Sequence, residues 1–162
     1  MASKKRKMSA AAASSSTRPI DKTIVNIVSG TITSTQTNRV LLTAVGPCTI
    51  KGLRWDLNYK NNSTASDYAM WAIYRLKEGY SVPTVSAADA TTLCEPEQEV
   101  LVWGVFQGTD IDASTGPAIM KDKGQTQTMR KLMNGDRLYL SITAGSAANN
   151  VLVGAVQFFC AF

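Results

Sequence analysis

The chain has 162 residues, of which 44% are hydrophobic, so it is long enough for one domain with a core and too short for two. Its 17 basic and 12 acidic residues leave a net charge of +5, and histidine is absent. Without histidine, Ser-His-Asp triads, Cys-His pairs and most zinc sites are excluded. We therefore expect a binding or assembly protein rather than an enzyme, with no catalytic residues, no cofactor and no metal site.

Residues 1–20 are predicted to form a disordered basic arm, because their Ala- and Ser-rich sequence has too little apolar surface to offset the entropy of ordering. The arm contains five basic residues and no acidic one, so the rest of the chain holds 17 − 5 = 12 basic and 12 acidic groups. This pattern is typical of a neutral globular module with a basic tail. Such a tail neutralises nucleic-acid phosphates, serves as a nuclear import signal, or only keeps the protein soluble. Its cations are Lys4, Lys5, Arg6, Lys7 and Arg18.

Residues 21–162 are predicted to form one all-β domain. Runs rich in Val, Ile, Thr and aromatic residues alternate with Gly, Pro and Asn, and no run has helical periodicity. Eight antiparallel strands favour a jelly-roll sandwich of two Greek keys, with an up-and-down barrel as the alternative. The last run is apolar on both faces, which is typical of a central strand. The candidate strands are residues 23–33, 39–45, 48–60, 68–77, 99–108, 126–132, 136–144 and 150–162.

The run 48–60 has a clear strand alternation, with Gly52 expected at a bulge that restores the register. Its polar face carries Lys51 and Arg54. Trp55 falls on the apolar face and is predicted to be a core residue, although beside these cations it would also suit a base-stacking platform.

The segment 128–145 predicts a hairpin with a two-residue turn at Asn134-Gly135. If Met133 pairs with Asp136, one face is apolar and is expected in the core: Met129, Met133, Leu138, Leu140 and Ile142. The opposite face carries Arg130, Arg137, Tyr139, Ser141 and Thr143. This second face is either solvated or contacts another subunit or a nucleic acid.

Three cysteines, Cys48, Cys94 and Cys160, are an odd number without metal-like spacing, so we expect buried free thiols in a reducing compartment. No secretory signal or membrane-length apolar run is present, and we expect no membrane partner. Two long connections, 78–98 and 109–125, carry acidic residues. These acids are expected to be solvated, with calcium binding between subunits as the alternative: Glu95, Glu97, Glu99, Asp110 and Asp112.

Four segments carry a resemblance to a known family. They are TMRKLMNGDRLYLSITAG (128–145, preceded by QTQ), CTIKGLRWDLNY (48–59), EPEQEVLVWG (95–104) and VGAVQFF (153–159). In type, order and spacing they resemble capsid proteins of small circular Rep-encoding single-stranded DNA (CRESS-DNA) viruses. The resemblance implies a jelly-roll subunit that self-assembles into a T=1-like icosahedral shell of about 60 copies. It also implies that single-stranded DNA is bound without sequence specificity.

By this resemblance the five cations of the arm contact phosphates, and Lys4 to Lys7 also bind a host nuclear import receptor. The protein is then expected in the virion and in the host cytoplasm and nucleus. Many relatives have longer, arginine-richer arms. About 60 arms carry roughly 300 charges, fewer than the 3 × 162 = 486 nucleotides that encode this chain alone. Other cations must therefore contribute.

Candidate interface or genome-facing residues are Lys51, Arg54, Arg130, Arg137 and Tyr139. Two alternatives remain open. One is a coat protein of a small RNA or satellite virus, and the other is a non-viral jelly-roll binding module with a basic tail.

Overall fold

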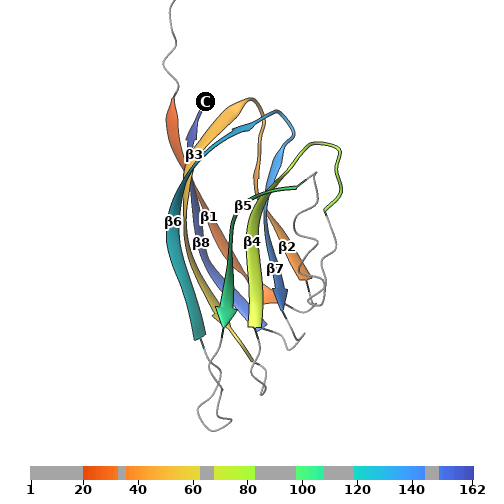
Figure 1. Ribbon diagram of the computed structural model, residues 1–162, viewed down its shortest axis with the longest axis vertical. Helices are drawn as coiled ribbons and strands as arrows, with labels where there is room; N and C mark the ends of the chain where they lie inside the picture. The colour runs from red at the N-terminus through yellow and green to blue at the C-terminus, as the bar shows by residue number, and fades with distance from the viewer. Residues whose placement is uncertain (1–19, 33–35, 63–67, 83–97, 108–118, 145–149) are drawn as a thin grey trace, which may run out of the picture.

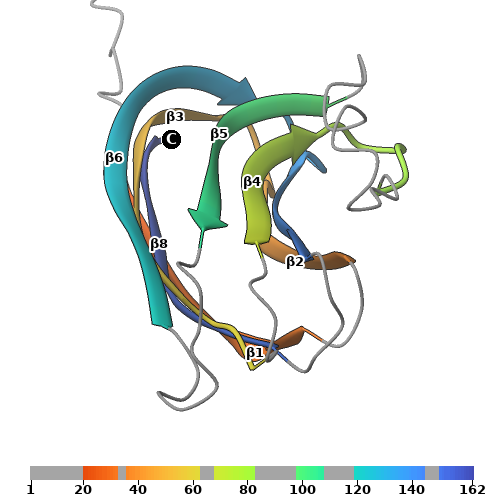
Figure 2. The ribbon, with the colours of Figure 1, turned by 60° about the horizontal axis from the view of Figure 1, so that its bottom comes forward.

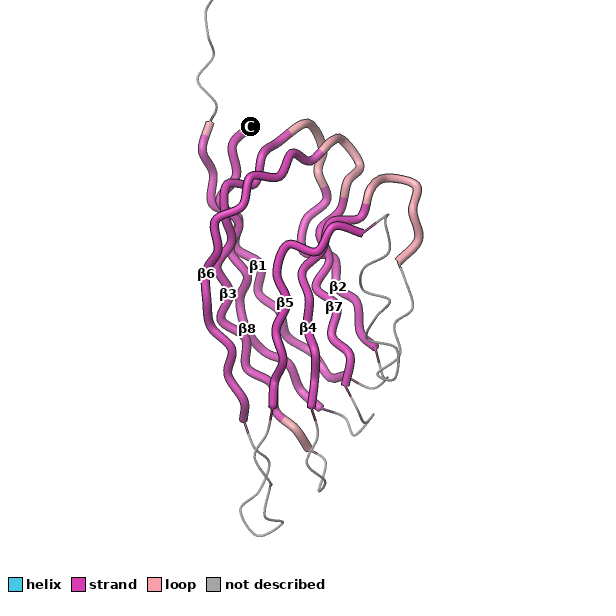
Figure 3. The backbone as a smooth tube through the Cα atoms, viewed as in Figure 1, coloured by secondary structure: helices cyan, strands magenta, loops and turns pink. Residues whose placement is uncertain are grey.

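A computed structural model describes residues 20–32, 36–62, 68–82, 98–107, 119–144 and 150–162. These residues form eight strands and no helix (Figure 3). The strands are β1 (Asp21–Ile32), β2 (Gln36–Thr43), β3 (Cys48–Lys60), β4 (Tyr68–Leu76), β5 (Gln98–Gln107), β6 (Ile119–Leu132), β7 (Arg137–Ala144) and β8 (Asn150–Ala161). The predicted basic arm lies outside the described residues except for Ile20.

The strands form two four-stranded antiparallel sheets, which face each other as curved layers (Figures 1 and 2). The first sheet has the order β1-β8-β3-β6 and the second has the order β2-β7-β4-β5. Apart from β4 and β5, neighbours within each sheet are not consecutive in the chain, which rules out an up-and-down barrel and is the strand order of a jelly roll. The all-β jelly-roll prediction is confirmed. β8 lies between β1 and β3, so its prediction as a central strand is also confirmed.

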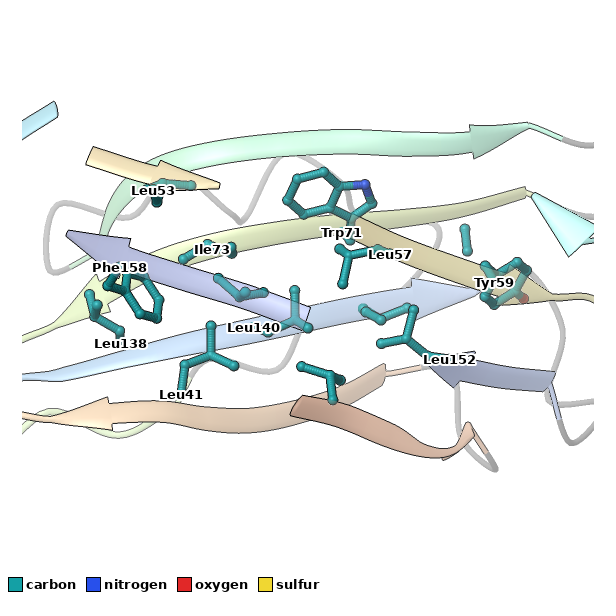
Figure 4. Close-up of a cluster of buried hydrophobic side chains, with 14 of the residues drawn as sticks. Leu41, Leu53, Leu57, Tyr59, Trp71, Ile73, Leu138, Leu140, Leu152 and Phe158 are labelled. Atoms are coloured by element: carbon teal, nitrogen blue, oxygen red, sulfur yellow. The ribbon is translucent and has the colours of Figure 1, made fainter. Parts of the chain in front are cut away.

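The core lies between the two sheets (Figure 4). Leu53, Leu57 and Phe158 of the first sheet and Ile73 and Leu140 of the second are 0 or 1% exposed. Burying each side chain of this size stabilises the fold by about 1.5–3 kcal/mol. In β3, inward apolar residues alternate with more exposed outward residues, whereas β7 of the second sheet is buried on both faces.

Two of the three cysteines can be placed. Cys48 and Cys160 are buried and free, as predicted, and burial raises the pKa of Cys160 to about 11, with the neighbouring Cys48 adding to the effect. Burial also raises the pKa of Cys48. The third, Cys94, lies outside the described residues.

The predicted hairpin is wrong in its pairing, because β6 belongs to the first sheet and β7 to the second. The turn itself is present: the Asp136 N–H donates to the Met133 carbonyl at 3.1 Å, and Gly135 has a φ of +86°. Since no cross-strand pairs link β6 to β7, each strand's inward face is set by its own sheet. Met129, near the end of β6, is 71% exposed, and Met133, in the turn that follows β6, is 56% exposed, both contrary to prediction. The β7 residues expected in the core are buried: Leu138, Leu140 and Ile142.

The predicted connection 109–125 is also wrong in part, because β6 already begins at Ile119. Its inward residues include Asp122 and Gly124, which break the apolar alternation that marks a strand. Gly124 is required there, since a Cβ would lie 2.4 Å from Cζ2 of Trp55. The other strand boundaries agree with the predictions to within a few residues. Residues 83–97 of the other connection lie outside the described residues.

Candidate nucleic-acid interface

The outward face of the first sheet is basic over β3 and β6. Among the described residues it carries six cations, Lys51, Arg54, Lys60, Lys121, Lys123 and Lys131, and two acids, Asp21 and Asp56. Two exposed ion pairs use both acids: Lys51 Nζ lies 2.6 Å from Asp21 Oδ1, and Lys123 Nζ lies 3.6 Å from Asp56 Oδ2. The face therefore keeps an excess of positive charge although the body of the chain is neutral.

Over β1 and β8 the same face exposes four large apolar side chains among polar ones. Val25 and Ile27 of β1 are 54% and 82% exposed, and Val153 and Phe159 of β8 are 46% and 41% exposed. The register places these residues beside the basic half: Phe159 lies opposite Gly52, and Val153 lies opposite Asn58. The outward face thus combines a basic half with a half that exposes large apolar side chains.

A strand irregularity interrupts this face near the end of the sheet at which β3 begins and β8 ends, where Gly52 was predicted to mark a bulge. The register of β3 shifts between Ile50 and Gly52 against both of its neighbours, which confirms the bulge. A hollow of about 530 Å³ opens there. It is lined by Lys51, Gly52, Leu53, Gln125, Thr126, Gln127, Met129 and Phe159.

Two predicted contact residues, Lys51 and Arg54, lie on this face. Arg54 is exposed, sits opposite Gln125 of β6 and Gln157 of β8, and has no ion pair among the described residues. Trp55 points inward, where the centroid of its ring lies 5.5 Å from that of the Trp71 ring. The core interpretation of Trp55 is therefore confirmed, and the stacking-platform alternative is wrong for this side chain.

The remaining predicted contact residues lie elsewhere. Arg137 and Tyr139 are on the outward face of the second sheet, where the Arg137 guanidinium donates to the Tyr139 hydroxyl at 3.1 Å. Tyr139 is only 4% exposed and stacks on Tyr74 with ring centroids 5.7 Å apart. Arg130 pairs with Glu99 and so joins the edge strands β6 and β5 of the two sheets. The five residues thus occupy three separate places.

An ion-pair chain continues from Glu99, which also pairs with Arg75 at 3.2 Å. Arg75 in turn contacts the buried carboxylate of Asp136 at 2.7 Å through Nη2 and at 3.0 Å through Nε. Burial by itself would raise the pKa of Asp136, but hydrogen bonds from the Met133 N–H and the Arg75 guanidinium hold that pKa below its usual value. No local sequence pattern predicts this cluster, because Arg75 lies 61 positions from Asp136.

The described residues contain no group of three or more His, Cys, Asp or Glu side chains that could hold a metal ion. The predicted acids Glu95, Glu97, Asp110 and Asp112 lie outside the described residues. In the part of the chain that the structure describes, no helix has the length and apolarity to cross a membrane.

No protein-family model and no curated protein sequence matches this chain. Similar solved structures include infectious bursal disease virus of the Gx strain (9% identity, TM-score 0.34) and the Gt strain (12%, 0.36), and the VP2 subviral particle of that virus (12%, 0.34). The matches cover 88%, 98% and 94% of this chain, which spans only 32%, 36% and 37% of theirs, about a third.

Proposed function

We propose that this chain is a viral coat protein that self-assembles into a small icosahedral shell and packages a circular single-stranded DNA genome. The observation that carries the proposal is where the charge lies: all of the net charge of the sequence falls in residues 1–20, and the arm joins the sheet with the basic outward face. Ile20 continues directly into β1 and exchanges two backbone hydrogen bonds of 3.1 Å with Phe162. Figure 1 shows the start of β1 close to the C-terminus, at the same end of the first sheet.

Arm and face together offer an extended surface for phosphates. The arm enters the first sheet at the end where Lys131 lies, whereas Lys60 and Lys121 lie at the opposite end, so an extended polyanion that meets the arm can continue along the outward face past Arg54 to these cations. Such binding is electrostatic, independent of sequence and steeply dependent on salt. The arms alone carry fewer positive charges than the genome has phosphates, and the cations on the sheet of each subunit supply part of the difference.

A jelly roll suits a shell subunit because its described strands leave two broad faces and four edge strands for contacts with other copies. Closed symmetric assembly of about 60 identical subunits gives a T=1-like shell. Lys4, Lys5, Arg6 and Lys7 would also bind a nuclear import receptor, which places the protein in the host cytoplasm and nucleus as well as in the virion. Arg130 and Arg137 remain proposed contact residues between subunits, whereas the Tyr139 side chain is already covered within its own subunit.

The test replaces Lys4, Lys5, Arg6 and Lys7 by glutamine in the full-length chain. We expect particles with much less packaged nucleic acid, and a plot of log affinity for single-stranded DNA against log salt whose slope is lower by about 3, at roughly 0.7 per cation. Electron microscopy and the absorbance ratio of purified particles measure the first, and fluorescence titration measures the second.

Deletion of the uncharged residues 9–16 is the matched control, because it shortens the arm without removing charge. It should leave both readings close to those of the wild type. If the glutamine variant packages as much nucleic acid as the wild type, the role of the arm is contradicted. Nuclease digestion of the extracted cargo separates DNA from the RNA of the alternative coat protein. A purified chain that forms no particles favours a binding module.

A further inference from the structure

We propose that the hollow at the β3 bulge holds one nucleotide of the packaged strand, with its base against Phe159 and its phosphate at Lys51. The inference deepens the proposed function and rests on it. It assigns to the jelly-roll domain a non-electrostatic contact with single-stranded nucleic acid, in addition to the charge of the arm and the sheet.

The hollow is a consequence of strand register. Between Ile50 and Gly52, β3 inserts Lys51 without a partner on β8, whose paired residues Cys160 and Phe159 are adjacent. Against β6 the same step spans two residues, Thr128 and Met129. The strands β8, β3 and β6 therefore lose their regular pairing at one level, and the outward face opens there.

Gly52 forms the floor of the hollow. It pairs with Phe159 on one side and Gln127 on the other, both of which are exposed on the outward face. A Cβ at Gly52 would lie 3.0 Å from the Thr126 carbonyl oxygen and 3.7 Å from Cδ2 of Phe159. The missing side chain thus leaves one edge of the Phe159 ring open toward β6.

The groups around the floor match the parts of a nucleotide. Phe159 offers an aromatic surface of the kind on which bases stack. The amides of Gln125 and Gln127 can donate to and accept from base edges. Lys51 is 43% exposed, and its one ion pair among the described residues is with Asp21, whose side chain is 69% exposed; such a pair contributes little, so a phosphate can replace the carboxylate.

The surroundings favour a nucleic-acid strand over an isolated small molecule. The hollow volume of about 530 Å³ is within the range of about 300–1,000 Å³ for small ligands. However, the hollow lies open on a sheet surface, and Arg54 lies next to it without an ion pair among the described residues. A strand that continues across the sheet can follow these cations from one phosphate to the next.

The experiment measures binding of an oligothymidylate to free subunits of the full-length chain at several salt concentrations. Stacking does not release counterions, so Phe159→Ala should weaken binding about tenfold at every salt concentration and leave the salt slope unchanged. Lys51→Gln should instead lower the slope by about 0.7. Val153→Ala, on the same strand and the same face but away from the hollow, is the matched control and should change neither reading.

Phe159→Leu keeps an apolar side chain but removes the ring, so it shows whether Phe159→Ala weakens binding only through misfolding. We expect Phe159→Leu to have the wild-type unfolding midpoint and still to lose most of the roughly tenfold in affinity. If both Phe159 variants bind as the Val153→Ala control does, the nucleotide site is overturned. In that case normal DNA-filled wild-type particles would leave the coat-protein proposal intact. A wild-type chain that binds no oligonucleotide at low salt contradicts the proposed site and the packaging role together.

Discussion

The Asp136 side chain is buried and accepts several hydrogen bonds. Its carboxylate is 4% exposed and accepts hydrogen bonds from Arg75 and from the backbone N–H groups of Met133 and Glu78. It therefore ties the β6–β7 turn to β4, across the end of the sandwich. The sequence predicted the turn but not this role, because local pattern carries no information about a partner 61 positions away.

We predict that Asp136→Asn destabilises the subunit by about 3 kcal/mol at neutral pH, because the partly buried Arg75 guanidinium loses its closest counter-charge. The pKa of Asp136 is lower in the folded chain than its usual value, so the stabilisation is complete above about pH 4 and is lost as pH falls below it. The variant should therefore show a flatter dependence of stability on pH. Urea unfolding at neutral and acid pH measures both effects.

Asp56→Asn is the control for this prediction, because Asp56 is 52% exposed and lies 3.6 Å from Lys123. A loss of at most about 1 kcal/mol is expected there. Equal stability losses in the two variants would show that the network around Asp136 contributes nothing beyond an ordinary surface pair.

Strand β6 shows where element prediction from sequence fails. β3 was predicted at its observed ends because its inward residues are apolar, whereas the first half of β6 turns Asp122 inward. Asp122 is compatible with that position because its carboxylate accepts hydrogen bonds from two indoles: Trp55 Nε1 at 3.0 Å and Trp71 Nε1 at 2.9 Å. Trp71 is in the second sheet, so Asp122 links both sheets. This pairing depends on three strands meeting and has no local signature.

We predict that Asp122→Ala destabilises the subunit by about 2–3 kcal/mol, since it leaves the N–H groups of Trp55 and Trp71 without their acceptor. Intrinsic fluorescence should change in the same variant, because both indoles lose their polar contact. Asp122→Asn retains one acceptor oxygen and should lose less. The Trp103→Phe background removes the signal of an indole that is 64% exposed. An Asp122→Ala variant with wild-type stability and emission would contradict the bridge.

At the scale of the molecule, composition described the charge balance but not its distribution. The body is neutral, which favoured a module whose only basic part is its arm. In the structure Glu99, Asp122 and Asp136 are used in contacts between strands, and the outward face of the first sheet keeps six cations against two acids. The fold class followed from alternation alone. Which face of the molecule carries the positive charge depends on the pairing of the strands, and the sequence pattern alone does not contain that pairing.

This distribution predicts that the sheet contributes to DNA binding independently of the arm. Replacing Arg54, Lys60 and Lys121 together by glutamine should lower the salt slope for single-stranded DNA by about 2, at roughly 0.7 per cation, with no change in the unfolding midpoint. Lys77→Gln, an exposed cation beyond the end of β4, is the control and should leave the slope unchanged. Combining the triple variant with the glutamine arm should add the two reductions, because distant cations act independently. A triple variant with the wild-type slope would confine the phosphate contacts to the arm, and the charge shortage of a packaged genome would then have to be met by small cations.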